Sequence, residues 1–138
     1  RDAWRHTFSG FVRYWFKPGV TSFTVNAGYT HNNAHGSNFD YDGYSAGARL
    51  ETRIYGPVWA SVEYSQDGRD YPNGFVSAFI PAPGRTEQDI TTVSFRVLWV
   101  ITGHWIADIH FRDTEYDANM PQFESEREQY GIGLTYKF

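Results

Sequence analysis

The stretch YGIGLTYKF, residues 130–138, closes the sequence and alternates strictly between two kinds of side chain. The apolar or aromatic set is Tyr130, Ile132, Leu134, Tyr136 and Phe138. Glycine, threonine and lysine occupy the positions between them. A period of two places the two sets on opposite faces of a β-strand. Because chain ends are usually poorly ordered unless they are tied down, this pattern predicts an ordered terminal strand.

The same period of two recurs along most of the chain. Its clearest instance is TTVSFRVLWVI, residues 91–101. Further strands are predicted at 7–16, 22–30, 44–55, 58–65 and 105–117. No stretch has the periodicity of an amphipathic helix. The sequence therefore predicts an all-β chain of about seven or eight strands. The apolar segment 74–81 could form the eighth, but the preferred interpretation is a hairpin within a loop or a docking segment.

Short and long connections alternate between these predicted strands. The short ones are KPG (17–19), GP (56–57) and TGH (102–104), and the long ones are 31–43, 66–89 and 118–128. Pro18 and Gly19 suit the two central positions of a type II turn. Loops of this length are uncommon in compact soluble domains. Regular alternation is typical of an antiparallel meander that forms a transmembrane β-barrel, with short periplasmic turns and long extracellular loops.

Composition restricts the function classes. Aromatic residues make up 19% of the chain, and the mean hydropathy is −0.55. No apolar run approaches the ~18 residues of a transmembrane helix, although transmembrane strands escape such window averages. The net charge of −4 argues against a nucleic-acid partner. The absence of cysteine excludes thiolate chemistry and disulfides.

Aromatic residues cluster at the ends of the predicted strands. Those beside the short turns are Tyr14, Phe16, Tyr55, Trp99, Trp105, Tyr136 and Phe138. At the opposite strand ends lie Tyr29, Tyr44, Tyr64 and Tyr130. Two aromatic belts around an aliphatic band are typical of a barrel surface that faces lipid, because amphipathic rings favour the membrane interface. This pattern favours a membrane barrel over a soluble β-sandwich.

The opposite face of the strands carries charges of both signs. We expect the following residues to line the lumen: Arg13, Arg49, Glu51, Arg53, Glu63, Arg96, Asp108, His110, Arg112 and Lys137. They would form ion-pair ladders that fill the interior, or line a wet channel. Gly131 and Gly133 share this face, where they would leave room for a bulky neighbour such as Trp59.

The C-terminus resembles that of bacterial outer-membrane β-barrel proteins, whose last strand alternates apolar residues and ends in phenylalanine. The matching residues are Tyr130, Ile132, Leu134, Tyr136 and Phe138. GLTYKF is also similar to the ends of larger export and conduit barrels, including polysaccharide-export and cytochrome-conduit porins. The resemblance implies the outer membrane of a Gram-negative bacterium, with the lipid bilayer as a partner. It also implies that the barrel-insertion machinery reads the last strand and that this strand pairs with the first.

An odd strand number departs from that class, whose single-chain members have an even number. A missed strand would restore the even number. Alternatively, residues 1–138 are the C-terminal portion of a larger barrel rather than a single barrel domain. A third option is a barrel that is completed by strands of another chain or by other envelope proteins.

Two clusters have residue types that suit chemistry. His31 and His35 in HNNAH, with Asp40 and Asp42, have the side chains of a metal site, but their spacing aligns them only in a helix. A solvated loop is the simpler interpretation. The acidic segments 67–74 and 122–128 do not have the spacing of a calcium loop. No metal or other cofactor is therefore expected.

Asp108 and His110, with Ser94 or Ser61 opposite, suit a hydrolase triad. Residues two apart on one strand face lie ~7 Å apart, too far for a direct Asp–His hydrogen bond without help. An ion-pair network is the preferred interpretation, and no catalysis is expected.

Three functions are consistent with these patterns. The first is an integral outer-membrane barrel that forms, or contributes to, a pore or conduit for export or diffusion. The second is a small plugged barrel that acts as a structural or adhesive anchor, with extracellular loops that bind a partner. The third is a soluble β-barrel that binds a hydrophobic ligand.

Overall fold

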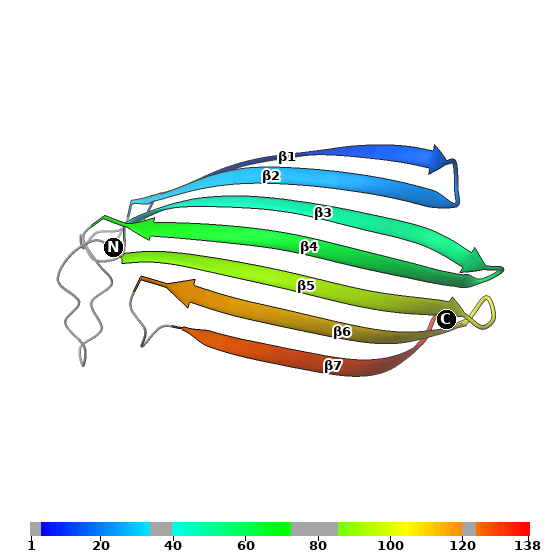
Figure 1. The fold of residues 1–138 in the computed structure, drawn as a ribbon. Coiled ribbons are helices and arrows are strands. Elements are labelled where there is room, and N and C mark those ends of the chain that lie inside the picture. Colours follow the sequence, from blue (N-terminus) through cyan, green and yellow to red (C-terminus); the bar gives the residue numbers. More distant parts are fainter. Residues whose placement is uncertain (1–3, 34–39, 73–85, 120–123) are drawn as a thin grey trace.

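A computed structural model describes residues 4–33, 40–72, 86–119 and 124–138. Its seven strands form one antiparallel sheet in which neighbours in sequence are neighbours in space (Figure 1). The strands are β1 (Trp4–Lys17), β2 (Thr21–Asn33), β3 (Tyr41–Tyr55), β4 (Val58–Tyr71), β5 (Thr86–Val100), β6 (Trp105–Ala118) and β7 (Ser125–Tyr136). The prediction of an all-β antiparallel meander is confirmed. The described residues contain no helix that is long and apolar enough to cross a membrane.

Several strands extend further than their predicted bounds. β4 continues to Tyr71 and β7 begins at Ser125, so residues 66–71 and 125–128 belong to strands and not to loops. In these extensions the backbone keeps its alternation, but apolar residues no longer mark one face. A hydrophobic pattern therefore could not reveal them. β7 ends at Tyr136, and the predicted extra strand at 74–81 lies outside the described residues.

The three short connections lie at one end of the sheet, here called the turn end, and the opposite end is the loop end (Figure 1). In the first turn Val20 N donates to Lys17 O at 2.9 Å, and Gly19 has a φ of 72°. This arrangement is the type II turn predicted from Pro18 and Gly19. In the second turn Gly56 has a φ of 48° and precedes Pro57, which suits a type II′ turn.

The third turn also holds the chain terminus. Lys137 N donates to His104 O at 2.7 Å, and His104 Nδ1 lies 3.0 Å from Lys137 O. The ring of Tyr136 lies between those of Trp105 and Phe138, with centroids 4.8 and 5.2 Å away. The last residues are thus tied to the β5–β6 turn even though they lie beyond the strand.

The register keeps the two faces separate across all six strand pairs. In one row Val25 pairs with Val12 and Ala48, and in another Phe95 pairs with Val62 and Phe111. The face that holds these rows is called the apolar face, and the opposite one the polar face. Because side chains alternate along a strand, each row of paired residues lies on one face.

The apolar face is uncovered. Ile132 is 86% exposed and Val12 is 74% exposed, and no described side chain on either face is fully buried. The polar face is the more sheltered of the two, since Ser22 and Thr114 are only 3% and 8% exposed. Single exposed apolar residues are ordinary, but a contiguous apolar surface across a whole sheet marks an interaction surface.

The two outer strands each have one hydrogen-bonded neighbour in the described sheet. In an antiparallel meander of seven strands, the first and last run in the same direction, from the loop end to the turn end (Figure 1). β1 and β7 therefore present two edges of equal polarity.

We predict that Gly19→Ala destabilises the fold by about 1 kcal/mol, because a left-handed backbone costs a residue with a Cβ about 1–2 kcal/mol. The measurement is the urea midpoint of the folded protein. Gly103→Ala is the matched control. A Cβ at either position meets nothing within 4 Å, but of these two glycines only Gly19 has a left-handed φ. An equal shift in both variants would contradict the turn assignment.

Candidate functional site

The polar face gathers most of the residues that the sequence predicts for the lumen. The structure places on it Arg13, Arg49, Glu51, Arg53, Glu63, Arg96, Asp108, His110 and Arg112. Lys137 lies past the end of β7, beside the turn at His104. The first nine residues come from β1, β3, β4, β5 and β6, so the register alone brings them together.

Two adjacent rows hold most of these charges. In the first, Arg49 pairs with Thr24 and Glu63, and Ser94 pairs with Arg112. In the second, one step nearer the turn end, Ser61 pairs with Glu51 and Arg96. Arg96 in turn pairs with His110. Each row therefore mixes cations, carboxylates and small hydroxyl residues.

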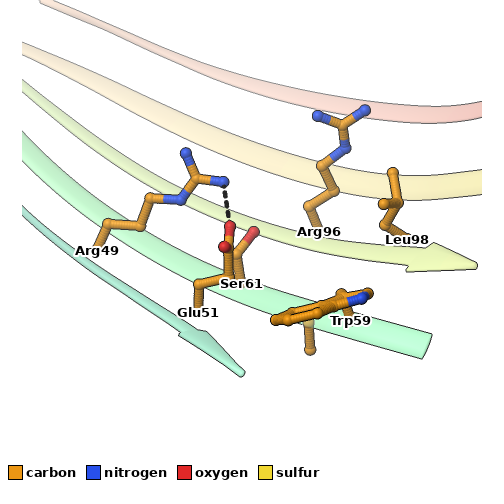
Figure 2. A pocket seen from close by; sticks show the side chains of 7 residues that line it. Arg49, Glu51, Trp59, Ser61, Arg96 and Leu98 are labelled. Atoms are coloured by element: carbon orange, nitrogen blue, oxygen red, sulfur yellow. Dashed lines mark hydrogen bonds and ion pairs between the residues drawn. The ribbon is translucent and has the colours of Figure 1, made fainter. Parts of the chain in front are cut away.

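Two neighbouring hollows lie over these rows. One of about 270 Å³ is lined by Arg49, Glu51, Trp59, Ala60, Ser61, Arg96 and Leu98 (Figure 2). A second of about 480 Å³ lies toward β6 and adds Glu63, Asp108, His110 and Arg112 to the lining. Because Arg49, Ser61 and Arg96 border both hollows, the two form one trough across β3–β6, which we call the central trough.

Ion pairs in the central trough run along strands as well as between them. Arg49 Nη2 lies 2.8 Å from Glu51 Oε2 on the same strand (Figure 2). Asp108 Oδ2 lies 3.1 Å from His110 Nδ1 and 3.5 Å from Arg96 Nε. The expectation that Asp108 and His110 are too far apart for a hydrogen bond is wrong. Their Cα spacing is unchanged, but the two side chains lean toward each other along the strand.

Glycines on β7 make that lean possible. A Cβ at Gly131 would collide with the His110 ring, and one at Gly133 would collide with Asp108 Oδ1. The side chains of His110 and Asp108 therefore lie over the β7 backbone at Gly131 and Gly133, where no Cβ blocks them. Trp59, the neighbour expected there, instead pairs with Leu98 and lies under Arg53, whose guanidinium is 6.0 Å from the ring centroid.

The structure does not assemble the hydrolase triad considered from sequence. Ser61 and Ser94 border the same trough as His110, but in the described part of the chain neither hydroxyl is hydrogen-bonded to the imidazole. Asp108 orients His110, and the nucleophile position is not filled. The arrangement is an Asp–His–Arg cluster.

His31, the first residue of the HNNAH segment, lies at the loop end. His31 Nδ1 is 2.7 Å from Asp42 Oδ1 across the β2–β3 pair, and Tyr29 Oη donates to the same oxygen at 2.7 Å. His35 lies outside the described residues. Among the described residues no three His, Asp or Glu side chains converge as a metal would require.

Tyrosines on the apolar face donate to carboxylates near the loop end. Besides Tyr29, Tyr44 Oη donates to Asp89 at 3.0 Å and Tyr130 Oη to Glu128 at 2.9 Å. The aromatic side chains predicted beside the turns are exposed at the other end of the sheet: Tyr14, Phe16, Tyr55, Trp99, Trp105, Tyr136 and Phe138. Phe16 and Tyr55 lie at register shifts, and Phe138 follows β7.

Sequence analysis missed further charges on the polar face. By register Arg5, Asp67, Arg69 and Arg127 share it with Arg49. Asp67 and Arg69 had been assigned to a loop. The sequence did contain one indication that Asp67 and Arg69 belong to the strand. The alternation of Ser61, Glu63 and Ser65 continues unbroken through these two residues.

We predict energetic coupling between Gly131 and His110 in a double-mutant cycle. Gly131→Ala should be about 1 kcal/mol more costly in the natural background than in the His110→Ala background, where the colliding ring is gone. Urea unfolding of the four proteins measures the difference. Gly10→Ala, where a Cβ meets nothing within 4 Å, is the uncoupled control. Equal costs in both backgrounds would show that the imidazole does not need the glycine.

Comparisons with known proteins leave the function to these geometric observations. No protein-family model, curated protein or solved structure matches the chain. The fold, the uncovered apolar face and the central trough are therefore the basis for a functional conclusion.

Proposed function

We propose that the chain forms part of the wall of an outer-membrane β-barrel in a Gram-negative bacterium and contributes to a pore or conduit for export or diffusion. The observation that carries this proposal is the uncovered apolar face opposite a charged and hollowed polar face. In this arrangement the apolar face contacts lipid, and the polar face lines a water-filled interior. The proposed role is non-catalytic.

The uncovered apolar face is energetically unfavourable in water. Removing apolar surface from water stabilises a protein by roughly 25 cal/mol per Å². Leaving the apolar face of seven strands in water would therefore forgo a large stabilisation, which a covering layer would provide. A second protein layer or lipid acyl chains could provide that cover. Lipid is favoured because apolar residues such as Val12, Val25 and Ile132 fill the middle of the face, together with Phe95 and Phe111, while the amphipathic tyrosine and tryptophan rings lie toward both ends.

Strand length is consistent with a membrane position. The strands have 12–15 residues, and a tilted strand needs about 9–11 to cross the hydrocarbon core. The surplus lies at the loop end, where tyrosines on the apolar face give way to carboxylates such as Asp42, Asp89 and Glu128. Tyrosine at an interface with polar side chains beyond it is the order expected from hydrocarbon to water.

Closure of the barrel needs strands beyond the seven described. Since β1 and β7 run in the same direction, direct pairing between them would be parallel. An odd number of further strands would make every contact antiparallel and the total even, as is usual in bacterial barrels. Upstream residues of a longer chain or a partner chain would supply these strands. The insertion machinery is then proposed to read β7 and the residues after it.

Reconstitution of the natural protein in planar bilayers tests the proposed function directly. We expect stepwise conductance, because the charged polar face would surround water. A protein that requires detergent but shows no conductance would favour the plugged anchor. Purification without detergent as a monodisperse species would contradict the membrane assignment altogether.

We also predict opposite tolerances on the two faces of β5. Val97→Arg, between Ala60 and Ile109 on the apolar face, should cost roughly 2–4 kcal/mol in a bilayer. Thr92→Arg is the matched control on the polar face, where its strand neighbours are the uncharged Ser65 and Thr114. Folding into lipid vesicles, followed by electrophoretic mobility with and without heating, gives the folded fraction. Equal tolerance of both arginines would refute the assignment of the faces.

A further inference from the structure

We infer that the central trough binds and passes oxyanions, that is, solutes that carry carboxylate or phosphate groups. This inference rests on the proposed function for passage, but the binding step does not require a conducting pore. It derives from the way the two signs of charge are divided between the faces of the sheet. The whole chain has a net charge of −4, which by itself gives no indication of an anion site.

Every described arginine lies on the polar face. The set is Arg5, Arg13, Arg49, Arg53, Arg69, Arg96, Arg112 and Arg127. The strand carboxylates on that face are Glu51, Glu63, Asp67 and Asp108. The polar face therefore has an excess of positive charge although the chain as a whole is acidic.

The remaining strand carboxylates lie on the apolar side of the loop end. They are Asp42, Asp70, Glu87, Asp89, Asp113, Glu115, Asp117, Glu126 and Glu128. Three of them accept hydrogen bonds from the tyrosines Tyr29, Tyr44 and Tyr130 on that same side. None of these carboxylates lines the central trough. Four of them, Asp42, Asp70, Glu87 and Asp89, instead border a separate hollow at the loop end together with Arg69.

Within the central trough, the guanidinium groups do not all have a close carboxylate partner. Arg49 has a close carboxylate partner in Glu51, at 2.8 Å. The Arg96 contact with Asp108 is 3.5 Å, and that carboxylate is shared with His110. In the described chain no carboxylate oxygen lies within ion-pair distance of Arg112, although its side chain borders the larger hollow. Donors of Arg96 and Arg112 are thus left for a solute.

The hollow is of a size and chemistry that suit a small oxyanion. Its volume of about 480 Å³ admits a multivalent anion. The planar guanidinium fork binds carboxylate and phosphate through two parallel hydrogen bonds. Ser61 and Ser94 add hydroxyl donors at the same rim. Low-dielectric walls concentrate the field of such a site, and arginine-lined constrictions favour anions.

The decisive experiment measures binding and selectivity separately on the natural protein. Calorimetry in detergent uses inorganic tripolyphosphate and citrate as the anionic probes and spermine as the cationic one. We expect both anions to bind and spermine not to bind, and the tighter anion identifies the preferred oxyanion. In bilayers, the reversal potential across a potassium chloride gradient should show preference for chloride.

Matched variants locate the site. Arg112→Gln should weaken anion binding roughly tenfold, or about 1.4 kcal/mol, because it removes charge-assisted hydrogen bonds to the anion. Arg112→Lys keeps the charge but loses the fork, and binding should weaken less. Arg5→Gln removes the same charge from the loop end of the polar face and should leave binding unchanged. Equal weakening in Arg5→Gln and Arg112→Gln would overturn the assignment to the central trough.

The wild-type measurements decide the inference even where a variant does not fold. Spermine binding in preference to both anions, or a reversal potential that favours potassium, would overturn it. Anion binding without any conductance would support the trough as an oxyanion site and contradict only the proposed pore. Conductance without anion binding or chloride preference would leave the pore standing and refute the inference.

Discussion

The antiparallel register is the constraint on which the other features of this sheet depend. Across six strand pairs, the register keeps the central apolar residues such as Val25 and Phe95 on one face and every described arginine on the other. A slip of one residue in any pair would exchange the two faces of every strand beyond it. Such a slip between β5 and β6 would place Arg112 opposite Val93 or Phe95. In the proposed membrane barrel, the cost of burying a misplaced guanidinium would therefore add to the hydrogen bonds in protecting the register.

The same register divides the acidic and basic residues. Cross-strand neighbours on one face interact, whereas residues on opposite faces are separated by the backbone. Glu51 and Asp108 partly neutralise the arginines of the central trough, at 2.8 Å from Arg49 and 3.5 Å from Arg96. Asp42 and Asp89 instead accept hydrogen bonds from tyrosines on the other side of the sheet. The net charge of the chain is thus a poor guide to the polar face, because most of the strand carboxylates lie on the other side of the sheet.

Sequence periodicity predicted the fold well where apolar residues mark one face. The seven strands, their antiparallel order and the type II turn at Gly19 all follow from local pattern. The strands were predicted to stop too early at the loop end. Around Asp67, Arg69 and Glu126 no run of apolar residues marks one face of the strand, so the hydrophobic pattern gives no signal there. The Asp108–His110 contact was also excluded wrongly. Cα spacing fixes where side chains start, but not how they lean across the small residues Gly131 and Gly133.

Strand direction also limits what can complete the sheet. In the proposed barrel, two copies in the same membrane orientation would bring β7 of one beside β1 of the other, and both strands run from the loop end to the turn end. That contact would be parallel, whereas all six observed contacts are antiparallel. A copy in the inverted orientation would pair correctly but would place its loops at the opposite membrane surface. An added strand that runs from the turn end to the loop end would pair antiparallel with β1 or β7 and would keep the loops at one membrane surface. An identical copy in the same orientation has no such strand at either edge.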